Sequence, residues 1–482
     1  MEYTNVLPAD ASAVVSIDTK VLVDKAGLSS GEKATAQQKL LEAAKGGMSA
    51  EAYQQLEKVV KDPAESGIDV DAPLYWFSSP TIASSIVAKV ADKGKLKASL
   101  DLMAKEGACQ PVTETDGYAF TSTGENLIIF NPYALMLVTP YNESNKEAAI
   151  GLLKQEASKS FTQKKAFDKM KGHEGDIHFF VSLAIFPEQY AQQFEMALPA
   201  GIQSKDMSAV GGLNFDKGKI VLTAENYTEN DSVKAIYDKQ KKLYKKLNNK
   251  FVKNYPANSL MYMAYNLNGE GLYQMLTRMP QFKSIQADSE EATVLKQFLS
   301  SIDGELTFGL TNISGFMPTI VAYAEVNDGS ALKTLYEQKD KVGMRGLIQQ
   351  NDNQYLYRDG MLNLYLGVKD NVLYVTNDEN VNKAPEQTVT PSVEEAPYAP
   401  EMKGRTGFVG LNVKAIFDLP MVKMAMANGG SEAKMYADLA SKVSFLSVSS
   451  DSEKSEIELS LTDKDTNALK QIVDFAKQFT GM

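Results

Sequence analysis

The sequence predicts an α+β protein built from two tandem homologous units, each a largely antiparallel sheet with helices packed on one face. The first observation is a repeat: Leu7–Asp18 returns as Tyr255–Asn266, and four further pairs of similar segments follow in the same order. Such a repeat indicates a duplicated structural unit. The second observation is that apolar and polar residues alternate within Ile457–Leu461. This alternation is typical of an antiparallel strand with one face in water, so we expect Glu458 and Ser460 on the wet face.

The repeat divides the chain into a first unit, residues 1–250, and a second unit, residues 251–482. Each unit is long enough to bury its own core. In the first unit, Asp18 or Thr19 can cap a helix after the opening strand, and Pro63 stops a later helix. The expected elements of this unit are strand 13–17, helices ending near Gly27, 31–44 and 50–61, strands 74–78 and 82–90, helix 95–105, strands 117–122, 127–130 and 135–139, and helices 146–155 and 163–171.

The second unit repeats this order with different local sequences. A strand at 260–265 leads to Asn266 or Asn268 as a helix cap, and Asp288 with Glu291 fits a capping box before a helix at 292–300. Each unit closes with a hairpin and a long helix. The hairpin turns are expected at 216–218 and 451–453.

One segment of the second unit departs from the repeat. A Pro-rich loop covers about residues 384–404, and proline at this density excludes a helix or a central strand. We therefore expect an exposed loop, and loops of this length are often functional or mobile.

Composition excludes several classes of function. Of 482 residues, 44% are hydrophobic and 23% are charged, and the net charge of −11 disfavours nucleic acid as a partner. Nothing approaches the apolar length of a membrane-spanning helix. Cys109 is the only cysteine, which excludes an internal disulfide and cysteine-based zinc sites. Because Met1–Asn5 lacks signal-peptide features, we expect a cytosolic chain or the mature or trimmed form of an exported one.

No motif in the chain predicts catalysis. The segment His173–His178 holds both histidines together with Glu174 and Asp176, but its Gly-flanked turn favours a plain loop over a metal site. The segment Ser30–Lys33 matches a Ser-x-x-Lys pattern, which an N-capping serine explains better. The sequence therefore identifies no catalytic residue. We predict no cofactor and no metal site, and the sequence favours a non-enzymatic protein over an enzyme.

Two stretches of the first unit carry a family resemblance: Tyr3–Asp18 with the following Val21–Gly27, and Met48–Gly67. On these stretches the chain resembles a family of uncharacterised Bacteroides envelope lipoproteins, domain of unknown function 4836. Members typically carry a lipoprotein signal that ends in a cysteine just before the Tyr-Thr-Asn start. The resemblance therefore implies a trimmed mature chain, with Met1-Glu2 in place of the lipidated cysteine, from a protein anchored in the cell envelope by that lipid alone. It carries over no catalytic residue.

Three hypotheses of function remain open. The first is a non-enzymatic binding or interaction module for a protein, glycan or small ligand, with its site in the groove between the units or at the Pro-rich loop. The second is a hydrolase with a dispersed carboxylate site. The third is a structural envelope component, which predicts no deep pocket and a sizeable apolar or flat patch on the surface.

Overall fold

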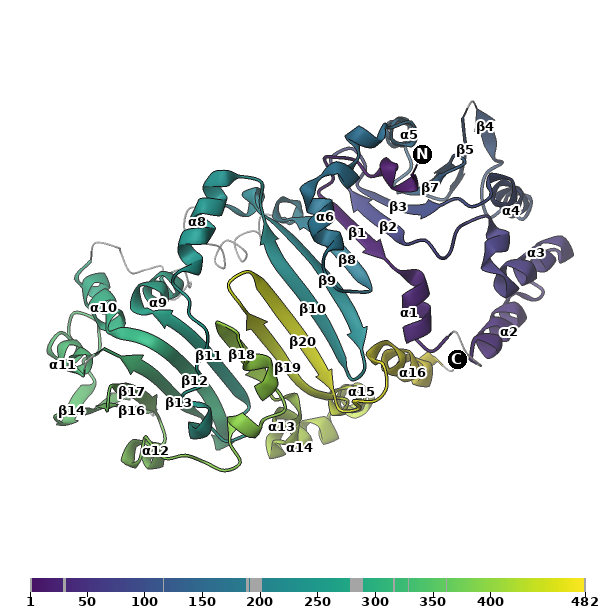
Figure 1. Cartoon of the computed structure of the whole chain (residues 1–482). Helices are drawn as coiled ribbons and strands as arrows, with labels where there is room; N and C mark the ends of the chain where they lie inside the picture. The colour runs from purple at the N-terminus through teal and green to yellow at the C-terminus, as the bar shows by residue number, and fades with distance from the viewer. Residues whose placement is uncertain are drawn as a thin grey trace. The chain divides into compact units, whose positions relative to one another are not determined.

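The structure is a computed structural model. It describes residues 2–28, 32–115, 117–187, 190, 202–277, 289–314, 317–327, 329–360 and 362–480. The chain forms two compact units. Figure 1 colours the chain from purple at the N-terminus to yellow at the C-terminus, so that α16 of unit 1 is yellow. Unit 1 comprises Met1–Ala191, Ser204–Tyr227 and Asp465–Met482, and unit 2 comprises Gln192–Gln203 and Thr228–Lys464.

The described part of unit 1 contains an antiparallel sheet in the order β10-β9-β8-β1-β2-β3-β7-β6-β5-β4. Its strands are β1 (Ala13–Ile17), β2 (Leu74–Ser78), β3 (Ser84–Lys89), β4 (Thr113–Thr115), β5 (Tyr118–Thr123), β6 (Asn126–Phe130), β7 (Ala134–Thr139), β8 (Ile177–Ser182), β9 (Ser208–Asp216) and β10 (Lys219–Tyr227).

The described part of unit 2 contains an antiparallel sheet in the order β20-β19-β18-β11-β12-β13-β17-β16-β15-β14. This is the order of unit 1 with ten added to each strand number. Its strands are β11 (Met261–Asn268), β12 (Ile302–Ser314), β13 (Met317–Val326), β14 (Leu347–Asn351), β15 (Gln354–Asp359), β16 (Leu362–Lys369), β17 (Val372–Thr376), β18 (Gly407–Leu411), β19 (Val443–Ser450) and β20 (Lys454–Leu461).

The helices occupy similar places in the two chain orders. Unit 1 has α1 (Thr19–Lys25), α2 (Glu32–Ala44), α3 (Ala50–Lys61), α4 (Lys93–Lys105), α5 (Glu143–Leu153), α6 (Lys165–Lys171) and α16 (Ala468–Thr480), with short 3-10 turns η1 (Tyr3–Val6), η2 (Pro63–Ser66), η3 (Ala157–Lys159), η4 (Phe161–Gln163), η5 (Leu183–Ile185) and η6 (Ser204–Asp206). Unit 2 has α8 (Asp231–Lys241), α9 (Gly269–Leu276), α10 (Glu290–Ser300), α11 (Ser330–Glu337), α12 (Glu379–Lys383), α13 (Val413–Asp418), α14 (Pro420–Asn428) and α15 (Gly430–Ser441), with the turns η7 (Val252–Asn254), η9 (Val393–Glu395) and η10 (Ala399–Met402). The α+β class is confirmed. Among the described residues, no helix has the length and apolar content needed to cross a membrane.

Corresponding backbone contacts recur in the two units. An isolated bridge joins Pro8 to Ser160 in unit 1, and another joins Pro256 to Ser392 in unit 2. Next to the second bridge, the Val393 N–H donates to the Tyr255 carbonyl oxygen at 2.9 Å. In unit 1, the Phe161 N–H donates to the Leu7 carbonyl oxygen at the same distance. The two segments that follow β7 and β17 are therefore anchored in the same way although their sequences differ.

The prediction that helices cover only one face of the sheet was wrong. In unit 1, Leu96 and Leu100 of α4 pack with Phe130 on one face of the sheet. Leu153 of α5 packs with Met136, which points to the other face. Neighbouring strand residues thus enter different cores, because side chains alternate across a strand.

The prediction of a wet polar face at β20 was also wrong. Glu458 and Ser460 are only 3% and 1% exposed, whereas Ile457 is 39% exposed and its cross-strand neighbour Val448 is 40% exposed. The residues of β20 do alternate between two faces of the sheet, but the face that carries Ile457 is more exposed than the face that carries Glu458 and Ser460.

The Pro-rich loop at about 384–404 is irregular, as predicted, but its expected exposure was wrong. Val393 and Tyr398 are fully buried and Met402 nearly so, and all three belong to a core of unit 2. Tyr398 packs edge-on against Phe445, with 5.9 Å between the ring centroids. The segment therefore covers one face of the sheet, where unit 1 uses α5 and α6.

The compact units and the sequence repeats differ at the end of the chain. The helix α16 belongs to unit 1, where it packs against β9 and α1. It follows β20, which belongs to unit 2. The proposed boundary between residues 250 and 251 concerns the sequence repeat, and it stays a prediction.

Candidate functional site

An apolar pocket in unit 1 lies between α3, α4 and the strands β6 and β7. Its volume is about 680 Å³, which is within the range of small-molecule sites. Figure 1 shows α3 and α4 as neighbouring helices. The lining residues are Gly47, Met48, Ala52, Gln55, Leu56, Val59, Ser66, Ile68, Leu96, Ser99, Leu100, Leu102, Met103, Glu106, Ala108, Ile128, Leu135 and Leu137.

The floor of the pocket comes from two strands that are apolar on both faces. Leu127, Ile129 and Met136 are fully buried in the core under one face. Ile128 and Leu137, which pair across the strands, point the other way and line the pocket. A sheet that is apolar on both faces needs cover on both. Here the second face is only partly covered, and the uncovered part forms the pocket floor.

The walls are the apolar faces of two helices. Ala52, Gln55, Leu56 and Val59 line the pocket from α3, and their spacing of three and four residues places them on one side of the helix. The N-terminus of α3 is capped by Ser49, whose hydroxyl accepts from Ala52 N–H at 3.2 Å. On α4, residues 96, 99, 100 and 103 give the facing wall in the same way, and Glu106 adds to it as the C-cap of the helix.

A close backbone approach fixes one end of α4. Gly67 has a φ of 81°, and a side chain there would collide with the backbone of Leu96 and Asp92. Glycine is therefore required where η2 meets the first turn of α4. The Asp92 side chain caps that turn by accepting from Gly94 N–H at 2.8 Å.

Polar contacts tie α3 to α4. The Glu106 carboxylate accepts from the Ser49 N–H at 2.9 Å, and this contact with Ser49 lowers the pKa of Glu106. The Gln55 amide donates to Ser99 Oγ at 3.4 Å. Lys95 makes an ion pair with Glu65 at 2.7 Å, but both groups are exposed, so this pair contributes little to stability.

The corresponding place in unit 2 is closed. Leu332 and Leu335 of α11 pack with Val294 and Leu299 of α10 in one core, together with Tyr355 of the sheet. All five are at least 94% buried. In unit 1, by contrast, the small core beneath α4 contains no residue of α3 among its members. The same strand order thus carries a packed core in unit 2 and an open apolar pocket in unit 1.

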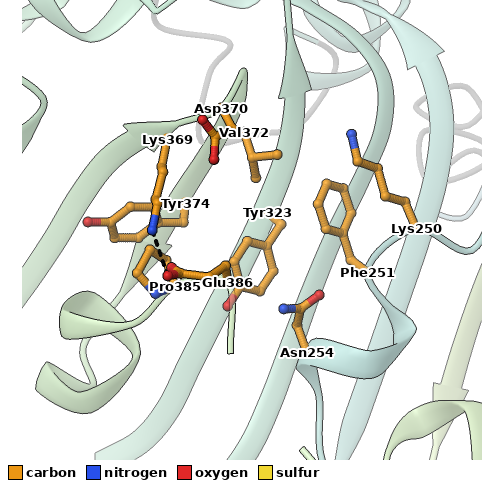
Figure 2. A pocket seen from close by; sticks show the side chains of 10 residues that line it. All are labelled: Lys250, Phe251, Asn254, Tyr323, Lys369, Asp370, Val372, Tyr374, Pro385 and Glu386. Atoms are coloured by element: carbon orange, nitrogen blue, oxygen red, sulfur yellow. Dashed lines mark hydrogen bonds and ion pairs between the residues drawn. The ribbon is translucent and has the colours of Figure 1, made fainter. Parts of the chain in front are cut away.

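A second, smaller pocket lies in unit 2 beside the Pro-rich segment, and Figure 2 shows the side chains that line it. Its volume is about 190 Å³. Phe251 and Tyr323 stack with 5.3 Å between ring centroids, and Lys369 pairs with Glu386 at 2.6 Å. A volume this small holds only a few atoms. A wider space of about 720 Å³ beside the same segment is lined largely by charged and amide side chains, among them Lys250, Lys253 and Glu394. The pocket in unit 1 is therefore the stronger candidate for an apolar ligand.

The histidine segment serves a structural purpose in unit 1. The His173 ring lies 3.3 Å from Glu225 Oε1, and the His178 ring lies 3.0 Å from the His173 carbonyl oxygen. Asp176 pairs with Lys25 at 2.8 Å. Burial lowers the pKa of His178. Both rings are engaged by protein groups, as a plain structural loop requires. Ser30, of the Ser-x-x-Lys pattern, lies outside the described residues.

Three carboxylates converge in unit 2. Ligand atoms of Glu401, Glu456 and Glu458 lie within 4.8 Å of one another. Arg405 donates to Glu456 at 3.0 Å, and Glu458 is 3% exposed. The arginine already supplies a positive charge to this group, which is therefore a weak candidate for a metal or for hydrolytic chemistry.

A buried carboxylate in unit 2 holds the segment before β11. Glu305 is 0% exposed, and its Oε2 accepts from the N–H groups of Asn248 and Asn249 at 2.9 and 2.8 Å. Asn249 has a φ of 56°; a left-handed turn of this kind aims successive N–H groups at one anion. Burial raises the pKa of Glu305, although these N–H donors act in the opposite direction.

Sequence reasoning missed the pocket, but one signal for it was present. The segments 127–130 and 134–138 are apolar without alternation. Such runs indicate a strand buried on both faces. Their sequence does not reveal that only part of the second face is covered by protein.

Comparison with known proteins gives a family without an assigned activity. The family model described as domain of unknown function (DUF4836) matches residues 3–469. The chain belongs to this family. No curated protein gives a significant match.

Two solved structures show a distant likeness. "Structure of crystal form IV of TP0453" has 10% sequence identity and a TM-score of 0.26, and the match covers 46% of this chain and 79% of that chain. "Structure of crystal form III of TP0453" has 9% identity and a TM-score of 0.27, covering 50% and 86%. At these TM-scores the likeness carries no argument about fold or function.

Proposed function

We propose that this protein is a non-enzymatic binding protein that holds an apolar small molecule in the pocket of unit 1. The observation that carries the proposal is the open apolar space between α3, α4, β6 and β7, at a position that unit 2 fills with its own side chains. Large exposed apolar surfaces on a folded protein generally mark binding sites.

The chemistry of the lining favours binding over catalysis. Among the described lining residues, Glu106 is the only one with an ionisable side chain. General acid–base or nucleophilic catalysis uses at least two cooperating polar groups close to the reacting atoms. Gln55 and Ser99 are neutral and suit orientation of a ligand.

We also propose that the native protein is a lipid-anchored component of a Bacteroides cell envelope and that its two units arose by duplication. The resemblance at Tyr3–Asp18 supports the first statement. The matching strand orders and the bridges at Pro8 and Pro256 support the second. After duplication, one copy would retain or gain a ligand pocket while the other closed its core.

The binding proposal is tested with the neutral fluorophore N-phenyl-1-naphthylamine, whose emission rises in apolar surroundings. The Ser99→Phe variant fills the space between α3 and α4, and the matched control Ala98→Phe adds the same ring at an exposed position of α4. We expect saturable binding by the wild type and the control. Ser99→Phe should weaken it on the order of tenfold or more, because the added ring displaces ligand from the pocket. Equal binding by both variants would contradict the proposal.

The hydrolase alternative requires turnover that depends on the cluster of Glu401, Glu456 and Glu458. A measured activity lost in the Glu458→Gln variant, with folding retained, would favour it over the binding proposal.

A further inference from the structure

We infer that the pocket of unit 1 selects a neutral amphiphile: one hydrocarbon chain carrying an uncharged hydroxyl or amide group. This inference rests on the binding function proposed above and specifies its ligand. It is drawn from the charges and hydrogen-bonding groups of the lining residues.

The first argument concerns charge. Glu106 is the only charged side chain in the described lining, and its lowered pKa keeps it ionised at neutral pH. Its Oε2 already accepts the Ser49 N–H. An anionic head group would find no cationic partner in the lining and would be repelled by this carboxylate. Placing such a charge beside apolar walls without a partner is unfavourable.

The second argument concerns the neutral polar groups. The Gln55 amide reaches Ser99 Oγ at 3.4 Å and the Glu65 carbonyl oxygen at 3.5 Å, which are long distances for hydrogen bonds. The Gln55 amide and the Ser99 hydroxyl therefore lie next to each other between α3 and α4, and both line the pocket. A hydroxyl or amide group can satisfy both, whereas a carboxylate can only accept.

The third argument concerns the hydrocarbon part. Ile128, Leu135 and Leu137 form the floor, and Leu56 and Leu100 stand on opposite helical walls. Met48 and Met103 add flexible side chains that adapt to ligands of different shape. The volume of about 680 Å³ is large enough for a chain of many methylene groups.

The test compares three ligands of equal chain length by displacement of N-phenyl-1-naphthylamine, each below its micelle concentration. They are monododecanoylglycerol, dodecanoic acid and dodecyltrimethylammonium. We expect the neutral glyceride to bind about tenfold tighter than dodecanoic acid, whose carboxylate would lack a partner in the lining. We also expect it to bind tighter than the ammonium ligand, because Glu106 is exposed and already accepts the Ser49 N–H, so pairing with it contributes little. Among glycerides of increasing chain length, Kd should fall about fourfold per methylene until the pocket is full.

A matched pair of variants examines the polar groups. Gln55→Leu removes the amide from the lining, and Gln54→Leu makes the same change at an exposed neighbour outside the lining. We expect Gln55→Leu to reduce the preference for the glyceride to about threefold or less while the fluorophore still binds. Gln54→Leu should retain the full preference.

The outcomes separate the two proposals. If the fluorophore binds in the pocket but dodecanoic acid or the ammonium ligand competes as well as the glyceride, the inference is overturned and the binding function stands. If the fluorophore and all three ligands fail to bind, both fail. Displacement of the fluorophore only by an amphipathic helical peptide would show that the occupant is a protein segment, which also overturns the inference.

Discussion

The neighbours Met136 and Leu137 on β7 give a direct prediction about the pocket, because they point to opposite faces of the sheet. Met136 is 0% exposed in the main core of unit 1. Leu137 is partly exposed and lines the pocket. Replacing each residue by alanine therefore separates stability from binding at adjacent positions of the chain.

The magnitudes follow from these environments. Met136→Ala leaves a cavity in a closed core, which costs about 2 to 5 kcal/mol of unfolding free energy. Leu137→Ala removes a side chain that already contacts water, so we expect a cost of about 1 kcal/mol or less. In the complex, however, Leu137 would lose roughly 40 to 60 Å² of contact with the ligand. At about 25 cal/mol per Å², this corresponds to about 1 to 1.5 kcal/mol, or a roughly five- to twelvefold weaker Kd.

The assay combines urea denaturation of the free protein with titration of N-phenyl-1-naphthylamine. We expect Met136→Ala to lower the unfolding free energy but to bind the fluorophore normally at urea concentrations below the transition. We expect Leu137→Ala to retain nearly all of the unfolding free energy but to bind the fluorophore more weakly. The reasoning is refuted if Leu137→Ala destabilises the free protein as much as Met136→Ala does and leaves the Kd unchanged.

Four further predictions concern the rest of the fold. Glu305→Ala should lower the unfolding free energy by about 3 kcal/mol or more, because it leaves buried N–H groups without an acceptor. Glu305→Gln keeps the acceptor and should cost less. A similar loss in both variants would contradict this prediction. Burial raises the pKa of Glu305 above its usual value near 4.5, so the folded state binds this proton more tightly than the unfolded state does. The unfolding free energy of the wild type should therefore fall as the pH rises above 4.5, and that of Glu305→Gln should fall less. The same pH dependence in both proteins would contradict this prediction. Ile457→Thr should change the unfolding free energy by less than about 0.5 kcal/mol, as at an exposed site, and a loss of about 2 kcal/mol would show that this residue is buried. Deleting Asp465–Met482 should lower hydrogen-exchange protection in β9 and α1 of unit 1, and loss confined to unit 2 would show that α16 belongs there.

Much of the local structure could be predicted from the sequence. The hairpin turn at 216–218 and the strand Leu74–Ser78 follow from turn residues and apolar runs, and both are present. The helix after Ser289 begins close to its expected place, although Ser289 caps it. These features depend on residues close together in the chain, so a local reading suffices.

Features that depend on distant residues could not be predicted in the same way. Alternation within Ile457–Leu461 identifies two faces of a strand, but only the rest of the fold decides which face is covered. Glu458 and Ser460 are buried because the Pro-rich segment and its Tyr398 cover their side of the sheet. Proline density correctly excluded an α-helix and a central strand, although the segment contains the short 3-10 turns η9 and η10. The exposure inferred from the same density was wrong, because burial depends on the sheet that the segment covers.

The candidate site shows the same limit. Its helical faces at α3 and α4 follow from the spacing of apolar residues, and its floor follows from the uninterrupted apolar strands. Whether two such surfaces meet in a packed core, as in unit 2, or leave a pocket, as in unit 1, depends on how far α3 stands from α4. That distance is set by long-range contacts such as Glu106 with Ser49.

The central claim is that an apolar molecule occupies the space between α3, α4, β6 and β7. The most direct measurement is a crystal structure of the protein with a bromine-labelled hydrocarbon chain, with the bromine located by its anomalous signal. The account predicts one strong peak in contact with Ile128, Leu135 or Leu137. A peak elsewhere, with this pocket empty at saturating ligand, would contradict it.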